Sequence, residues 1–61
     1  MELKNYFINE KKYNDFKGLE EKELTKKAKA YFNRKIFGTV VKAYEPFIAE
    51  DGTYLITLKV K

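Results

Sequence analysis

The middle of the chain repeats its hydrophobic residues at the spacing of an α-helix. Over residues 19–34 the apolar positions follow one another at intervals of four, three and one, as Leu24, Ala28, Tyr31 and Phe32. At 100° per residue these side chains share one stripe. Glu20 and Glu21 precede the stripe, in a first turn where the helix dipole favours negative charge. The pattern predicts one amphipathic helix, with Gly18 as its expected N-cap.

From residue 36 onward the hydrophobic period becomes two, which is typical of strands. Asp51 and Gly52 stand between two apolar runs and predict a β-hairpin, whose two-residue type I′ turn takes a positive φ at both positions. The paired strands are then residues 36–50 and 53–60. Pro46 removes a ladder donor, so a bulge or an edge position is expected there, which lets the preceding carboxylate reach water.

This register sorts the strand residues between two faces, with Phe47 opposite Ile56 and Ala43 opposite Val60. One face, on which Glu45 is the only charge, collects Phe37, Thr39, Val41, Ala43, Phe47, Ala49, Tyr54, Ile56, Leu58 and Val60. A slip of one residue would place these side chains on the wrong face. The buried set is therefore expected to include Leu24, Ala28, Tyr31, Val41, Phe47, Ile56 and Leu58.

The helix stripe and the apolar strand face predict an α+β fold. It is a small two-layer domain, with one basic amphipathic helix packed on a C-terminal β-hairpin. The cluster Tyr6-Phe7-Ile8 fits a short strand, which would give the order β-α-β-β, and residues 9–15 are expected to form a loop held by Tyr13 and Phe16. Residues 1–61 are expected to be a single domain with a thin core, because so short a chain buries only about 60% of its surface.

The other face of the predicted hairpin mixes apolar side chains with bases. Its apolar members are Val40, Tyr44, Ile48 and Leu55, beside Lys42, Thr57, Lys59 and Lys61. Such a face suits an interface, covered by the N-terminal segment, by a second copy in a homodimer or by another protein. The register also sets Tyr44 opposite Lys59 and Lys42 opposite Lys61, and rings interleaved with bases suit single-stranded nucleic acid.

The formal net charge of +4, from 13 Lys and Arg against 9 Asp and Glu, is concentrated in the predicted helix. Residues 17–35 hold seven bases against three acids, which accounts for the whole excess. Lys22, Lys26 and Lys29 fall opposite the apolar stripe and form a basic ridge, with Arg34 near the helix end. The ridge predicts contacts with phosphates, although the solvent face of an ordinary surface helix carries similar charges.

The composition excludes several classes of chemistry. The chain has no Cys and no His, which removes disulfides, thiolate-held zinc and the usual general base. Its three glycines form no phosphate-binding loop, so an enzyme, a cofactor site and a metal site are not expected. With no signal peptide and no apolar run near the ~20 residues of a membrane span, a cytoplasmic protein without a membrane partner is expected.

Two functions fit these patterns. The first is a small nucleic-acid-binding or DNA-associated regulatory protein. Its phosphate contacts are Lys22, Lys26, Lys29 and Arg34, with Lys42, Tyr44 and Lys59 as a second surface. The second is a protein-interaction module, such as a small inhibitor or accessory subunit, which docks on a larger protein through Val40, Tyr44, Ile48 and Leu55 or by adding its edge strand. The salt dependence of binding distinguishes the two functions, because phosphate binding weakens steeply with ionic strength and apolar docking does not.

Overall fold

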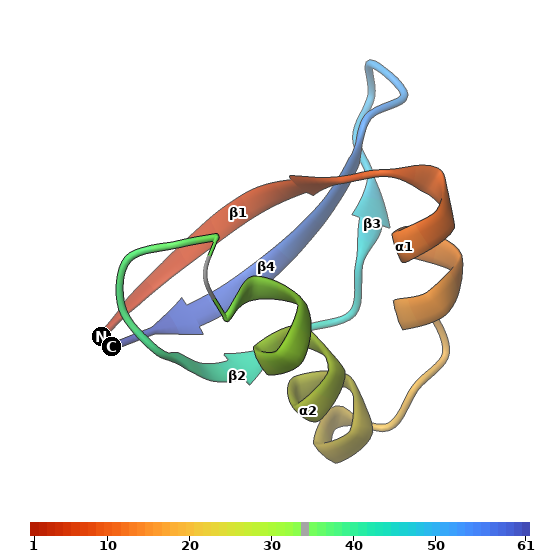
Figure 1. The fold of residues 1–61 in the computed structure, drawn as a ribbon. Helices are drawn as coiled ribbons and strands as arrows, with labels where there is room; N and C mark the ends of the chain where they lie inside the picture. The colour runs from red at the N-terminus through yellow and green to blue at the C-terminus, as the bar shows by residue number, and fades with distance from the viewer. Residues whose placement is uncertain (34) are drawn as a thin grey trace.

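The computed structural model describes residues 1–33 and 35–61 of the chain. The elements are β1 (Glu2–Ile8), α1 (Glu10–Phe16), α2 (Glu21–Phe32), β2 (Val40–Ala43), β3 (Phe47–Ile48) and β4 (Tyr54–Val60). All pairings are antiparallel, and β4 lies between β1 on one side and β2 and β3 on the other (Figure 1). The predicted α+β fold is confirmed, with α2 packed against the β2 and β4 part of the sheet.

The core lies between the two helices and one face of β4. Ile56 and Leu58 have no exposed surface, and Leu24 and Ala28 of α2 belong to the same buried cluster. The periodicity therefore predicts these four correctly. Tyr31 and Val41 are only half-buried, and Phe47 is 40% exposed, so its predicted place in the core is wrong.

The N-terminal segment forms a long strand and a helix, where a short strand and a loop are predicted. β1 pairs with β4 along its whole length, from Glu2 opposite Val60 to Ile8 opposite Tyr54. The residues predicted to be a loop form α1, because the side chain of its N-cap, Asn9, accepts a hydrogen bond from the backbone N–H of Lys12 at 2.7 Å. The expected anchors of this segment are confirmed, since Phe16 is buried and Tyr13 packs against the core.

The turn between β3 and β4 is one residue longer than predicted. The Gly52 N–H donates to the Ala49 carbonyl at 2.9 Å, and the Ala49 N–H donates to the Thr53 carbonyl at 2.8 Å. Gly52 has a φ of +87°, whereas no non-glycine residue described by the structure, Asp51 included, has a positive φ. This excludes type I′ and fits a three-residue loop, a type I turn closed by a left-handed glycine.

Asp51 fastens this turn through its side chain. Its Oδ1 accepts hydrogen bonds from the Thr53 hydroxyl at 2.7 Å and from the Thr53 N–H at 3.0 Å. These bonds favour the ionised form, the hydroxyl more than the N–H, and hold the pKa of Asp51 below its usual value. Asp51 therefore stabilises the turn through its carboxylate, and its backbone lies outside the left-handed region.

The longer turn exchanges the faces of two residues in β3. Phe47 lies opposite Leu55 instead of Ile56, and Ile48 lies opposite Tyr54. Since residues paired across strands share a face, Phe47 moves to the side of the sheet away from the helices and Ile48 moves to the helix side. The predicted place of Ile48 on the mixed face is therefore wrong, and the reason is the one-residue slip.

Two further irregularities shift the pairing of β2. Residues 44–46 fall between β2 and β3, around the proline where a bulge is predicted, and Ala43 consequently pairs with Leu58 instead of Val60. A bulge between Val40 and Lys42 then sets Val40 opposite Val60. Val40 is only 4% exposed in this position, so its predicted role as an interface residue is wrong.

The helix connection is tied to the same break in the sheet. Glu45 is exposed, as predicted, and its Oε1 accepts a hydrogen bond from the Gly18 N–H at 2.8 Å. Gly18 follows α1 with a φ of +76°, so it belongs to the end of that helix and is not the N-cap of α2. The N-cap of α2 is Glu20, which makes no side-chain capping bond.

Gly38 is required by the close approach of the loop before β2 to the end of β4. Its φ is +96°, and a Cβ on it would lie 2.6 Å from the Lys61 carbonyl oxygen and 2.8 Å from Val60 Cγ1. Gly38→Ala is therefore expected to lower the free energy of unfolding by about 1–3 kcal/mol, measured by urea titration. Gly52→Ala is the control, since nothing lies within 4 Å of its Cβ and only backbone strain of about 1–2 kcal/mol is added. A larger loss for Gly52→Ala would contradict this packing.

Candidate functional site

The sheet surface turned away from the helices, here the outer face, carries three rows of side chains. Antiparallel register aligns β1, β4 and the β2–β3 edge, and alternate residues point to this face. The row nearest the β3–β4 turn is apolar and consists of Phe7, Leu55 and Phe47. The middle row is Asn5, Thr57 and Tyr44. The third row is Leu3, Lys59 and Lys42. None of the nine is a carboxylate.

The apolar row is exposed, because both helices pack on the opposite face. Phe7 is 74% exposed and Phe47 is 40% exposed, with Leu55 half-buried between them. The two rings start from strands that are about 9–10 Å apart, two strand spacings. The row is therefore a ready platform for flat or apolar groups.

The other two rows supply polar and positive groups. The Thr57 hydroxyl donates to Asn5 Oδ1 at 2.6 Å. The Lys42 ammonium lies 4.9 Å from the centre of the Tyr44 ring and 3.3 Å from Glu21 Oε1, on the first turn of α2. Lys59 stands on the central strand, beside Lys42. The outer face thus changes from aromatic to basic along the strand direction.

Four predicted residues share the outer face: Lys42, Tyr44, Leu55 and Lys59. Their pairing differs from the prediction, since Tyr44 is opposite Thr57 and Lys42 is opposite Lys59. The predicted neighbours Val40 and Ile48 lie on the other side.

Sequence reasoning missed four members of this face, Leu3, Asn5, Phe7 and Phe47. The first three belong to β1, where odd-numbered residues point outward. The segment shows no strict apolar–polar alternation, since Lys4 and Asn5 are adjacent polar residues, and the apolar cluster Tyr6-Phe7-Ile8 is the signal that indicates this strand.

The basic ridge is confirmed as an exposed surface. Lys22, Lys26 and Lys29 are all exposed on α2, and Lys29 also lines a hollow with Gly38 and Val40 at the start of β2. Because α2 packs on the face of the sheet opposite the outer face, the ridge and the outer face lie on different sides of the molecule. Arg34, predicted to extend the ridge, lies outside the described residues.

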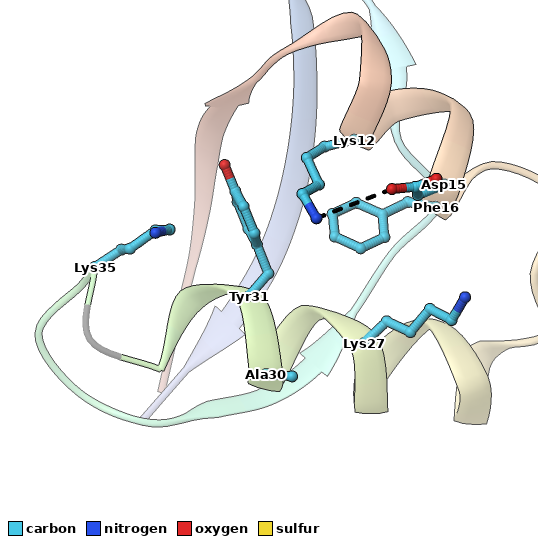
Figure 2. A pocket seen from close by; sticks show the side chains of 7 residues that line it. All are labelled: Lys12, Asp15, Phe16, Lys27, Ala30, Tyr31 and Lys35. Carbon is cyan, nitrogen blue, oxygen red and sulfur yellow. Dashed lines mark ion pairs between the residues drawn. The ribbon is translucent and has the colours of Figure 1, made fainter.

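A groove between α1 and α2, here the interhelical groove, is the third surface (Figure 2). It has a volume of about 600 Å³ and is lined by Lys12, Asp15, Phe16, Lys27, Ala30, Tyr31 and Lys35. Tyr31 rises from α2 between two ammonium groups, that of Lys12 at 4.8 Å from the ring centre and that of Lys35 at 5.0 Å. Lys12 also meets Asp15 at 3.9 Å. The ridge prediction did not anticipate this cluster.

Neither a group of metal-ligating side chains nor a helix able to span a membrane is found in residues 1–33 and 35–61. No three acidic side chains there converge as metal ligands, and no helix there is long and apolar enough to cross a membrane. No protein-family model, curated protein or solved structure matches the chain. The geometry of the three surfaces is therefore the basis for inferring a function.

Proposed function

We propose that the protein binds single-stranded nucleic acid on its outer face. The observation that carries the proposal is the order of its rows, with two exposed phenyl rings at one end and two lysines at the other, and no carboxylate among them. Single-strand binders stack bases on aromatic rings and attract the backbone with positive charge. A duplex keeps its bases stacked inside and offers nothing to such rings.

The spacing of the rows suits a strand laid along β4. Successive rows are two residues apart, or about 7 Å, so the face spans about 13 Å from rings to lysines. Bases would rest on Phe7 and Phe47, and phosphates would lie near Lys59 and near Lys42, whose exposed ion pair with Glu21 a phosphate would replace. Between them, Asn5 and Thr57 already bond to each other, which leaves few groups to read a base edge. Binding is therefore expected to depend little on sequence.

The test is a titration of single-stranded and duplex oligonucleotides of one sequence at two ionic strengths. The single strand should bind more tightly, and its affinity should fall as salt rises. Lys59→Gln should reduce the slope of log K against log salt by about 0.7, the value for one phosphate contact on a single strand. Tyr44→Ala should weaken single-strand binding by about 1–3 kcal/mol and leave duplex binding unchanged.

The basic ridge provides the matched control for charge. Replacing Lys22, Lys26 and Lys29 with Gln removes three positive charges from a different side of the molecule. At 0.15 M salt, where the Debye length is about 8 Å, single-strand affinity should change by less than about threefold. If this triple variant loses single-strand binding while Lys59→Gln and Tyr44→Ala retain it, the ridge is the phosphate surface and the outer-face proposal is wrong.

A protein partner is the second candidate, favoured by the exposed apolar side chains and by an open sheet edge. Leu3 is 62% exposed on the same strand and face as Phe7, and β1 pairs on one side only among the described strands. The other edge is partly covered, because the Ala43 N–H donates to Thr25 Oγ1 of α2 at 3.1 Å. An extended segment of a larger protein, or a second copy in a homodimer, would add beside β1.

Oligonucleotide binding at low salt distinguishes nucleic-acid binding from protein docking. A parent protein with no affinity for any oligonucleotide would exclude the first and leave docking of a protein. Sedimentation over a range of concentrations then identifies a second copy as that partner, or shows that the partner is another protein.

A further inference from the structure

We propose that the interhelical groove binds a phosphate-bearing ligand of nucleotide size. The groove lies on the helix side, away from the outer face, so this inference stands independently of single-strand binding. Two sources share this chemistry, a free nucleotide and the terminal phosphate of a nucleic-acid strand.

The lysines of the groove come together through the fold and not through one helix repeat. Lys12 belongs to α1, Lys27 belongs to α2, and Lys35 follows α2 in the loop toward β2. A solvent-exposed helix face acquires lysines by its amphipathic pattern alone, as the basic ridge does. Convergence of three segments on one hollow does not follow from that pattern, and it gives the groove three positive side chains against one carboxylate.

Tyr31 holds two of these lysines in place. Its ring is half-buried, and the ammonium groups of Lys12 and Lys35 lie on either side of it in Figure 2. Cation–π contacts of this kind fix long side chains that would otherwise be free, which lowers the entropic cost of binding an anion. Since the ammonium groups flank the ring, the groove recognises its ligand by charge and not by stacking on Tyr31.

The single carboxylate does not neutralise the groove. Lys12 and Asp15 meet at 3.9 Å, with side chains 33% and 49% exposed, and pairs of this kind contribute little. A phosphate monoester carries about two negative charges, and a diphosphate carries more. Because the Tyr31 ring separates the ammonium groups of Lys12 and Lys35, a single phosphate pairs with one of them at a time, whereas a ligand with two charged groups can reach both.

The size of the groove indicates a ligand larger than a single phosphate ion. Its volume of about 600 Å³ lies within the 300–1,000 Å³ typical of small-molecule sites. Ala30 keeps one side open because its side chain is small, and the buried Phe16 lines another side. A nucleotide fits such a space with its phosphates toward the lysines.

The test is a titration of the full chain with inorganic pyrophosphate and with ADP, followed by calorimetry and by amide chemical shifts. Both should bind with Kd below about 1 mM at low salt, with shift changes around Lys12, Lys27 and Lys35. Lys27→Gln and Lys35→Gln should each weaken binding about three- to fivefold, and the double variant about tenfold or more. The controls Lys22→Gln and Lys26→Gln, on the ridge of the same helix, should change Kd by less than twofold.

Pyrophosphate has no base to stack, so its failure to bind would overturn the groove proposal without affecting the outer-face proposal. Ridge variants that weaken binding as much as Lys27→Gln and Lys35→Gln would also overturn it. Oligonucleotides with a 5′-phosphate or a 5′-hydroxyl distinguish the two sources. A preference for the phosphorylated strand that Lys35→Gln abolishes supports a strand end, and pyrophosphate binding without that preference supports a free nucleotide.

Discussion

The Ile56→Ala variant is expected to lose about 2–5 kcal/mol of its free energy of unfolding. Ile56 has no exposed surface, and it lies on β4, the strand with which β1, β2 and β3 all pair. Removing its branched side chain leaves a cavity between the sheet and α2. At about 0.05–0.15 kcal/mol per residue, a chain of this length has only about 3–9 kcal/mol in total. The variant is therefore expected to be largely or partly unfolded at room temperature.

Urea denaturation followed by far-UV circular dichroism measures this loss. Ile48→Ala is the matched control, because it removes the same atoms from a side chain that is 53% exposed. Its cost should stay within about 1 kcal/mol, near that of other surface substitutions. Equal losses in the two variants would contradict the burial of Ile56 and the exposure of Ile48.

The double variant Phe7→Ala, Phe47→Ala is expected to lower the affinity for single strands by about 2–6 kcal/mol, from two stacking rings at about 1–3 kcal/mol each. Duplex binding should not change, since a duplex offers no free base to these rings. The fold should be retained, because both side chains are largely outside the core. Fluorescence anisotropy with labelled oligonucleotides measures the affinity, and circular dichroism checks the fold.

Phe37→Ala separates stacking on the outer face from a general effect of exposed rings. Phe37 is 100% exposed, but it lies in the loop before β2 and outside the three rows. Its removal should leave single-strand affinity unchanged. A double variant that binds as tightly as the parent would contradict the proposed function, and a loss on Phe37→Ala alone would move the surface to that loop.

The parts of the fold that could be predicted are those encoded by local periodicity. Leu24 and Ala28 repeat at helical spacing and are buried on α2, and Ile56 and Leu58 alternate with polar residues and are buried on β4. These patterns depend only on neighbours within the same element. The rest of the chain therefore does not alter these patterns.

The strand register could not be predicted, because it depends on the length of the turn, which the residues of one strand do not encode. Asp51-Gly52 is compatible with a two-residue turn and with a three-residue loop, and the glycine takes a positive φ in either. The structure has the longer loop. With it, Phe47 and Ile48 exchange faces, although the sequence around them is unchanged.

The candidate sites were predicted where a single helix or a single hairpin carries their residues. Lys22, Lys26 and Lys29 are on one helix, so their exposure follows from its periodicity. Phe7 joins Phe47 only because β1 pairs with a strand at the far end of the chain. The groove lysines likewise come from separate segments, and no sequence spacing predicts that they meet.

The position of β4 determines the order in which the sheet can assemble. β3 and β4 are joined by a short turn and can pair early, whereas β1 must find β4 across nearly the whole chain. Closing so long a loop costs chain entropy before the new contacts compensate it, which makes folding slower than in helical proteins of this size. Until β1 docks, one edge of β4 is bare and can pair with another molecule. Docking of β1 therefore covers this edge of β4 and leaves β1 itself as the open edge of the finished sheet.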